Sequence, residues 1–308
     1  MNKFDMHVHS TLSDGVNSPK DILDYASRTW FKLITLTDHD IASSKDFVLN
    51  AKEKWITSFS ASEISVRDYD IDKSLHFTYY AKDFNSKVKD IIQNTREKKI
   101  DMIVAQIDKL KQKGFIIDIN DFYNYYLSKW KTIETLNKMC IAKYIFQNIS
   151  NIDFITKIVW KNISEEEFLH LFLKEWWDYY EQYSNKIKDY EPSVEVCWAL
   201  AIANKAVLSI AHPNLTFWKN GISYFKELLP KYTKFWVNAI EINSKAPKEW
   251  LGAIYEAKKQ FDLVLTAWSD NHFIWYSDRK HWNIWEINQL LTIEDREKIL
   301  KEFMLWFS

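Results

Sequence analysis

The sequence predicts an α/β fold with mainly parallel strands, interrupted in its middle by a helical segment. Seven short apolar or β-branched runs, each ending in polar residues, have the length and composition of strands. Several of them are separated by amphipathic stretches with helical spacing, and their ends carry most of the histidines. Strands that alternate with helices favour a parallel arrangement, in which functional side chains collect at the carboxyl ends of the strands.

The strand-like runs lie in the two outer parts of the chain. They cover residues 3–10, 32–40, 56–65 and 74–81, and then 206–213, 238–244 and 263–270. After the first run, Ser18 is suited to cap a helix that continues with Pro19 and has Asp21 three residues after the cap. Residues 246–260 have the spacing of another amphipathic helix. Strands that alternate with helices are therefore predicted on both sides of the middle segment.

The middle of the chain has a different pattern. Helical spacing recurs over 88–115, 119–129, 133–147 and 164–175, with no clear strand between these segments. Ser164 and Glu167 form a capping box before the last of them. We therefore predict an α/β domain formed by residues 1–85 and 193–308, and a helical insertion over residues 86–192.

Composition excludes several classes of protein. The formal net charge of the 308 residues is −1, so the chain lacks the basic surplus with which proteins neutralise nucleic-acid phosphates. Cys140 and Cys197 lie too far apart to suggest a disulfide framework or a cysteine zinc site. No apolar run reaches the roughly 18 residues of a membrane span, and the first histidine motif begins too early for a signal peptide. We expect a cytoplasmic, soluble protein with no obligate protein partner.

Imidazole and carboxylate side chains gather at the ends of the predicted strands. His7 and His9 point to the same face of one strand, because side chains alternate with period two. A single histidine at a strand end is more often structural than a ligand, but six of the 8 histidines fall in such motifs. The mixture suits zinc, manganese or iron. The candidate metal ligands are His7, His9, Asp14, His39, Glu63, His76, His212, Asp270 and His272.

In order along the chain, the motifs HVH, LSDG, TDHD, SEIS, LHF, AHP, IEI and SDNH resemble those of the polymerase and histidinol phosphatase (PHP) family of metal-dependent phosphoesterases. The resemblance covers about residues 3–85 and 193–290. It implies a distorted (β/α)7 barrel that holds up to three divalent ions of manganese, zinc or iron at the strand ends. By the same resemblance, the first ion would be held by His7, His9, Glu63 and Asp270, the second by Asp14, His39 and His272, and the third by Glu63, His76 and His212.

The resemblance also implies a reaction. Neighbouring metal ions lower the pKa of a bridging water and neutralise phosphoryl oxygens, which is the chemistry of phosphate-ester hydrolysis. Asp14, His39, Glu63 and His272 are the expected catalytic residues. The helical insertion resembles that of PHP members that hydrolyse nucleoside 3′,5′-bisphosphates or trim short RNA from its 5′ end. We therefore expect a small phosphorylated substrate of this kind, and no membrane partner.

Two residues of the insertion depart from the pattern of those members. In the segment NKMCIA, Lys138 stands where the relatives have arginine, and Cys140 stands where they have histidine. Lys138 can bind a substrate phosphate as a point charge, or it can be solvated while Cys140 is a small buried residue. A phosphatase of the histidinol-phosphate type is an alternative function. Another is a non-catalytic nucleic-acid-binding module that keeps the metal site for structure.

Tryptophan and glycine occur in abnormal proportions, with 15 tryptophans and 4 glycines. Trp30, Trp55, Trp236 and Trp268 precede predicted strands or the SDNH motif, where turns and close backbone approach favour glycine. One hypothesis is that most of these positions are glycine in the natural protein, because its gene uses the codon UGA for glycine. The alternative is that the indoles form surfaces for base stacking or for a partner. The first hypothesis predicts local strain or exposed indoles at residues 268, 275, 282 and 285.

Overall fold

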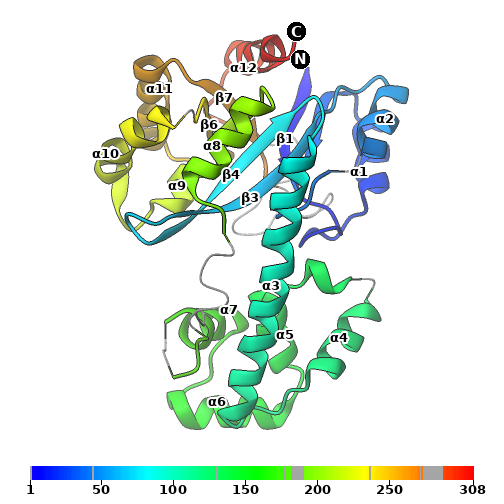
Figure 1. Cartoon of the computed structure of the whole chain (residues 1–308), viewed down its shortest axis with the longest axis vertical. Coiled ribbons are helices and arrows are strands. Elements are labelled where there is room, and N and C mark those ends of the chain that lie inside the picture. The colour runs from blue at the N-terminus through cyan, green and yellow to red at the C-terminus, as the bar shows by residue number, and fades with distance from the viewer. Residues whose placement is uncertain are drawn as a thin grey trace. The chain divides into compact units, whose positions relative to one another are not determined.

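The computed structural model describes residues 2–43, 45–129, 131–175, 178–181, 191–235, 237–270, 272 and 287–308. The chain divides into two compact units (Figure 1). The first unit comprises residues 1–93 and 191–308, and the second comprises residues 94–190. Each unit has a hydrophobic core of its own, so each is described separately.

Seven strands in the first unit coincide with the seven predicted runs. They are β1 (Lys3–Val8), β2 (Phe31–Leu36), β3 (Ser60–Asp68), β4 (Lys73–Ala81), β5 (Val207–Ile210), β6 (Ala239–Asn243) and β7 (Val264–Trp268). β1 pairs with β2 in parallel, and the other five form one sheet in the order β3-β4-β5-β6-β7. Isolated bridges from Leu33 to Thr57 and from His39 to Glu63 link the two sheets.

The strand directions differ in part from the expectation of a parallel fold. β5, β6 and β7 are parallel, but β4 runs antiparallel to both β3 and β5. The reason is the short connection between β3 and β4, which spans residues 69–72. A parallel pair needs a crossover of about a dozen residues or more, whereas a short turn joins antiparallel strands. The two runs were predicted correctly as strands, and the hairpin between them was not.

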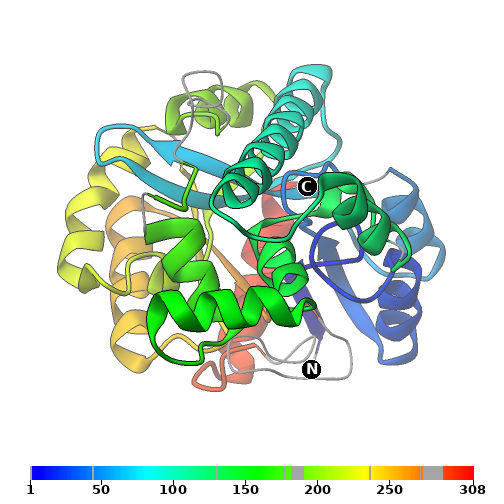
Figure 2. The same ribbon diagram turned by 90° about the horizontal axis from the view of Figure 1, so that it is seen from below.

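Helices cover the strands of the first unit. They are α1 (Pro19–Arg28), α2 (Lys45–Glu53), α8 (Val194–Ala203), α9 (Pro213–Thr216), α10 (Gly221–Lys234), α11 (Lys248–Phe261) and α12 (Ile293–Trp306). Figures 1 and 2 show α1 and α2, in blue, on the opposite side of the strands from α10 and α11, in yellow to orange. The predicted capping box of Ser18 and Asp21 begins α1. Thr292 and Asp295 form a further capping box that begins α12.

The core of the first unit lies between these helices and the strands. Met6, Ile64, Phe77 and Ile240 are fully buried in it, and they come from four different strands. Burying a side chain of this size contributes roughly 1.5–3 kcal/mol. A rigid set of strands results, and it fixes the positions of the polar residues at the strand ends.

The second unit is helical, as the pattern of the middle segment predicts. It contains most of α3 (Ser86–Gln112), followed by α4 (Ile119–Leu127), η1 (Ile133–Thr135), α5 (Lys138–Ile145), α6 (Ile149–Val159), α7 (Glu165–His170) and η2 (Leu171–Glu175). Its core includes Ile107, Phe122, Ile141 and Phe168, all fully buried. The predicted capping box of Ser164 and Glu167 begins α7. In the part of the chain that the structure describes, no helix is both long and apolar enough to cross a membrane.

Candidate metal centre

The nine predicted ligands come together at one end of the strands of the first unit. Each lies within 3.7 Å of at least one other member of the set. They reach this place from the ends of β1, β2, β5 and β7, from the middle of β3 and β4, and from the loop after β1. Because the ends of several strands meet at one edge of the fold, residues as far apart in the sequence as His7 and His272 lie close together.

Glu63 lies at the centre of this cluster and is fully buried. Its Oε1 is 2.9 Å from His76 Nδ1 and 2.9 Å from His212 Nε2. Its Oε2 is 3.2 Å from His7 Nε2 and 3.3 Å from His9 Nε2, and it is 3.0 Å from His39 Nδ1. One carboxylate therefore faces five imidazoles, with its two oxygens turned to different sets. This is the arrangement expected of a ligand that bridges two ions.

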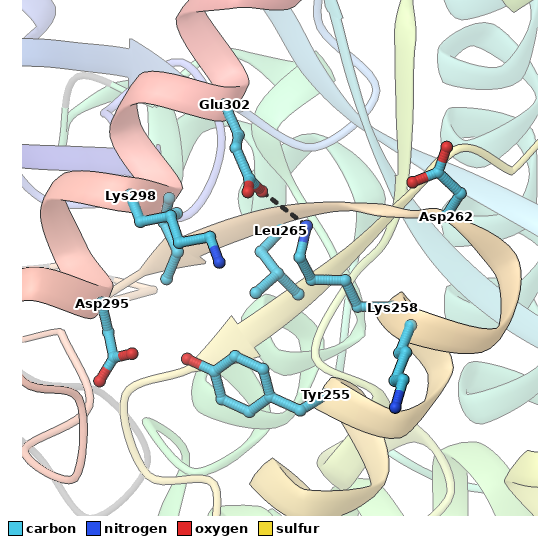
Figure 3. A pocket seen from close by; sticks show the side chains of 9 residues that line it. Tyr255, Lys258, Asp262, Leu265, Asp295, Lys298 and Glu302 are labelled. Carbon is cyan, nitrogen blue, oxygen red and sulfur yellow. Dashed lines mark hydrogen bonds and ion pairs between the residues drawn. The ribbon is translucent and has the colours of Figure 1, made fainter.

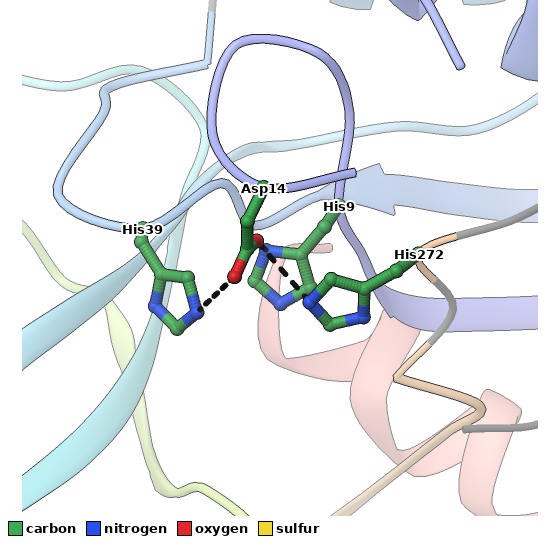
Figure 4. Close-up of side chains that lie close together, drawn as sticks. All are labelled: His9, Asp14, His39 and His272. Atoms are coloured by element: carbon green, nitrogen blue, oxygen red, sulfur yellow. Dashed lines mark ion pairs between the residues drawn. The ribbon is translucent and has the colours of Figure 1, made fainter. Parts of the chain in front are cut away.

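Asp14 is the second carboxylate to which imidazoles converge (Figure 4). One of its oxygens lies 3.2 Å from His272 Nε2, and the other lies 3.7 Å from His39 Nε2. His9 stacks against both of these histidines, with ring centroids 4.5 Å from His39 and 4.4 Å from His272. Asp270 completes the set, because its Oδ1 is 3.4 Å from His9 Nε2.

The geometry fits the binding of cations. The Nε2 atoms of His7 and His9 lie 3.0 Å apart. In the neutral rings, each of these atoms can direct a lone pair at the space between them. Converging lone pairs of this kind suit a shared positive ion. Three groups each bring their donor atoms within 4.8 Å of one another: His9, Asp14, His39 and His272; His7, His9 and Glu63; and His39, Glu63 and His76. Nitrogen and oxygen ligands bind zinc at about 2.0–2.2 Å, so the atoms need only small shifts to share an ion.

The grouping implied by the family resemblance is less separated in space than expected. His9 faces Glu63 with Nε2 and lies 3.7 Å from Asp14 with Nδ1, so it borders two of the groups. His39 does the same, with Nδ1 toward Glu63 and Nε2 toward Asp14. Two imidazoles therefore lie between neighbouring groups of candidate ligands.

The electrostatics follow from burying acids beside imidazoles. Burial alone would lower the pKa of His7, but the carboxylates of Glu63 and Glu241 outweigh it and raise that pKa to about 10. Burial would raise the pKa of Glu63, yet the surrounding histidines hold it well below its usual range. The pKa of Asp14 is lowered for the same reason, chiefly by His272 and His39. The carboxylates of Glu63 and Asp14 are therefore ionised and can bind a cation.

Glu241 in β6 is a functional candidate that sequence reasoning missed. It is fully buried, its Oε1 accepts from His7 Nδ1 at 3.0 Å, and its Oε2 accepts from the backbone N–H of His212 at 2.7 Å. In the neutral ring, a proton on Nδ1 in this bond leaves the lone pair of His7 on Nε2, the atom that faces Glu63. In the sequence, the sign of this role was a single acidic residue between two isoleucines of a predicted buried strand.

Asp38 and Gly15 shape the loop that carries Asp14. Asp38 accepts from Ser10 N at 2.7 Å, from Ser10 Oγ at 2.8 Å and from Ser13 Oγ at 2.6 Å. At Gly15 the loop folds back so closely that a Cβ atom would lie 2.5 Å from the carbonyl oxygen of His9. Only glycine fits there without a shift of the backbone. These contacts set the position of Asp14 beside the histidines.

Two expectations about other residues have different outcomes. Trp268 is neither exposed nor in a positive-φ conformation. It is fully buried, and its indole stacks on His7 with ring centroids 4.1 Å apart, because the end of β7 points into the cluster. The prediction of an exposed indole there was wrong. Local strain is present only in that the buried Nε1 has no hydrogen-bond acceptor. Residues 275, 282 and 285 lie outside the described residues.

Lys138 lies in the second unit, as the first residue of α5. Its Nζ is 4.3 Å from the centroid of the Tyr180 ring, a cation–π contact. Cys140 is buried in the core of that unit, in keeping with a small apolar role.

A separate cavity of about 550 Å³ lies between α11 and α12 (Figure 3). Lys258, Lys259 and Lys298 line it together with Asp262, Asp295 and Glu302. Lys258 Nζ donates to Glu302 at 2.6 Å, so part of the charge is neutralised within the wall. None of the nine candidate ligands lines this cavity.

Known proteins resemble this chain in sequence and in fold. The profile of the PHP domain family matches residues 5–245. A 5′-3′ exoribonuclease of Haemophilus influenzae is 41% identical over 64 residues, which cover 20% of this chain and 23% of that protein. A phosphoribosyl 1,2-cyclic phosphate 1,2-diphosphodiesterase of Eggerthella lenta is 22% identical over 117 residues, covering 37% and 45% of the two proteins. The matched part of the chain spans less than half the length of these curated relatives.

Two solved structures share the fold over nearly the whole chain. One is a protein of Bifidobacterium adolescentis that is predicted to be a metal-dependent phosphoesterase. It has a TM-score of 0.69 and 18% identity, over 98% of this chain and 96% of that chain. The other is described as an amidohydrolase of Chromobacterium violaceum with bound sulfate and no metal. It has a TM-score of 0.71 and 16% identity, over 97% and 96% of the chains.

Proposed function

The chain belongs to the PHP domain family, and from this we propose that it is a metal-dependent phosphoesterase acting on a nucleoside 3′,5′-bisphosphate or on the 5′ end of a short RNA. One observation carries the hydrolase proposal. Six histidines and three carboxylates from seven separate segments converge around Glu63 and Asp14. A structural metal site is normally closed by four ligands, whereas nine are suited to several ions with open positions.

The residues of the cluster have distinct roles in this proposal. When bound, divalent ions activate a water molecule and neutralise the oxygens of the reacting phosphate. Glu63 would be a central ligand of the ions, since its two oxygens face different imidazoles. Asp14 and His272 would hold a further ion, and the Asp14 side chain is 27% exposed there. That exposure offers a substrate phosphate its approach.

The substrate class rests on two weaker supports. The 41% identity to a 5′-3′ exoribonuclease covers a fifth of the chain and favours a nucleotide or RNA substrate. The second unit carries Lys138 at the first turn of α5, where a cation lies at the positive end of a helix dipole that favours a phosphate. We propose that this unit acts as a substrate cap and that Lys138 binds a substrate phosphate.

Phosphate release from adenosine 3′,5′-bisphosphate by the manganese-loaded protein tests the proposal. Histidinol phosphate and a short 5′-phosphorylated RNA serve as competing substrates, and a His9→Ala variant serves as the control. Release from the bisphosphate or the RNA that is lost in the variant supports the proposed substrate class. Release from histidinol phosphate alone would replace that class with a small-metabolite ester. Bound metal without hydrolysis of any of the three would favour a nucleic-acid-binding module.

A further inference from the structure

Three tryptophans occupy a backbone conformation that suits glycine. Trp30, Trp55 and Trp160 have φ values of 64°, 61° and 58°, in the left-handed region. This region is unfavourable for residues with a Cβ atom, and for a bulky aromatic residue it is a genuine outlier. The other non-glycine residues with positive φ in the described chain are, with one exception, aspartates or histidine, which adopt this region more often than other residues. They are Asp40, Asp72, Asp262, Asp270 and His212, and the exception is Lys205.

Each of the three tryptophans ends a helix at the position where glycine is most frequent. After α2, Trp55 N donates to Lys52 O at 3.0 Å and Ile56 N donates to Ala51 O at 3.0 Å. These two bonds define a Schellman motif, which usually has glycine at its left-handed residue. Trp160 N donates to Thr156 O at 2.9 Å after α6, and Trp30 N donates to Ser27 O at 3.3 Å after α1.

The same chain provides a matched glycine for comparison. At the end of α3, Gly114 has a φ of 98° and donates to Lys111 O at 3.1 Å. Phe115 N then donates to Leu110 O at 3.1 Å. The bonding pattern is that of Trp55 and Ile56, residue for residue. Trp55 thus has the positive φ and the hydrogen-bonding pattern that Gly114 has at the end of α3.

The three indoles gain nothing from packing that would compensate for the backbone cost. Their relative exposures are 85% for Trp30, 93% for Trp55 and 91% for Trp160. Tryptophans used in cores or in interfaces bury a large area and satisfy the indole N–H. These side chains project into solvent from three separate helix ends, so they do not form one aromatic surface within either unit.

Composition provides the independent observation. An average chain of this length would hold about 20 glycines, whereas this one has 4 glycines and 15 tryptophans, 19 residues together. We infer that residues 30, 55 and 160 are glycines in the protein as its source organism makes it, because that organism reads UGA as glycine. The tryptophan count and the glycine deficit then have one cause.

At the candidate metal centre, Trp268 stacks on His7. Its ring centroid also lies 5.8 Å from that of His212, so the indole fills space directly beside two candidate ligands. Its Nε1 is buried without an acceptor, which is costly. If residue 268 is also glycine, that space is open in the natural protein, and a substrate group can enter beside His7.

Peptide mass spectrometry of the protein isolated from its source organism, with the nucleotide sequence of its gene, tests the inference. UGA codons at positions 30, 55 and 160, with peptides of the mass that glycine gives, are the expected result. UGG codons, or peptides with the mass of tryptophan, would overturn the inference. Neither outcome depends on the enzymatic activity, so the proposed function stands or fails separately.

The unfolding temperature tests the structural part. A Trp30→Gly/Trp55→Gly variant should unfold about 2 °C or more above the chain with tryptophan, since a kcal/mol shifts Tm by a few degrees in a protein of this size. Trp218→Gly is the matched control, because Trp218 is 68% exposed but has no positive φ. It should leave Tm unchanged or lower it. An unfolding temperature of the double variant equal to or below that of Trp218→Gly would contradict a glycine geometry at residues 30 and 55.

Discussion

Replacing Glu241 with glutamine probes how the buried carboxylate supports the metal centre. Glu241 accepts from His7 Nδ1 at 3.0 Å through one oxygen and from His212 N at 2.7 Å through the other. Glutamine keeps the size, but it has a single acceptor oxygen and turns an NH₂ group toward one of the two donors. Losing a partner behind a metal-binding histidine typically lowers metal affinity 10–100-fold. We expect Glu241→Gln to bind manganese about 10–100-fold more weakly.

Competition with a chromogenic chelator measures this change in affinity. Glu191→Gln is the matched control, because Glu191 is also buried but accepts from Ser74 Oγ at 2.7 Å and faces Arg67 instead of a candidate ligand. The control should bind manganese with native affinity. Native affinity in Glu241→Gln as well would refute the reasoning that Glu241 orients His7 for metal binding.

Four further predictions follow from the contacts. Asp38→Asn removes a carboxylate oxygen that serves Ser10 and Ser13, so urea unfolding should show a loss of about 1–3 kcal/mol; an unchanged midpoint would contradict this. Phe77→Ala should cost about 3–5 kcal/mol, because Phe77 is fully buried between β3 and β5; a loss below 1 kcal/mol in the same assay would argue against that packing. Because the pKa of His7 is near 10, its ring is protonated in the metal-free protein and must release a proton when it binds a metal, so metal affinity should rise with pH between about 6 and 9. Calorimetry in two buffers of different ionisation enthalpy should therefore give different heats of metal binding, and equal heats would exclude proton release. Replacing residues 94–190 with a short linker should preserve metal binding and impair turnover; full turnover without these residues would rule out the proposed cap.

The strands and the convergence of the candidate ligands could be predicted from the sequence, because local patterns encode them. Apolar or β-branched runs ending in polar residues predicted all seven strand positions, and the candidate ligands on or beside these strands come together in the fold. The direction of β4 could not be obtained in this way, since the pattern of a strand does not depend on the direction of its neighbours. The eight-residue gap between the runs at 56–65 and 74–81 was the available sign of a hairpin.

Residues that act through others were harder to find. Glu241 and Asp38 lie in motifs that the sequence shows, but their partners, His7 and Ser10, are distant along the chain. The environment of Trp268 was misjudged for a related reason, because its burial depends on the direction in which the end of β7 points. Metal binding by the nine candidate ligands and phosphate binding by Lys138 stay predictions.

The most direct test of the proposed chemistry compares the native chain with a Glu63→Gln variant, in bound manganese and in phosphate release from adenosine 3′,5′-bisphosphate. Glu63 faces five imidazoles, and glutamine keeps its size while removing its charge. We predict that the native chain binds more than one ion and releases phosphate, and that Glu63→Gln loses both bound manganese and turnover. A variant that keeps its ions and its native rate would contradict the central role of Glu63 in the metal centre.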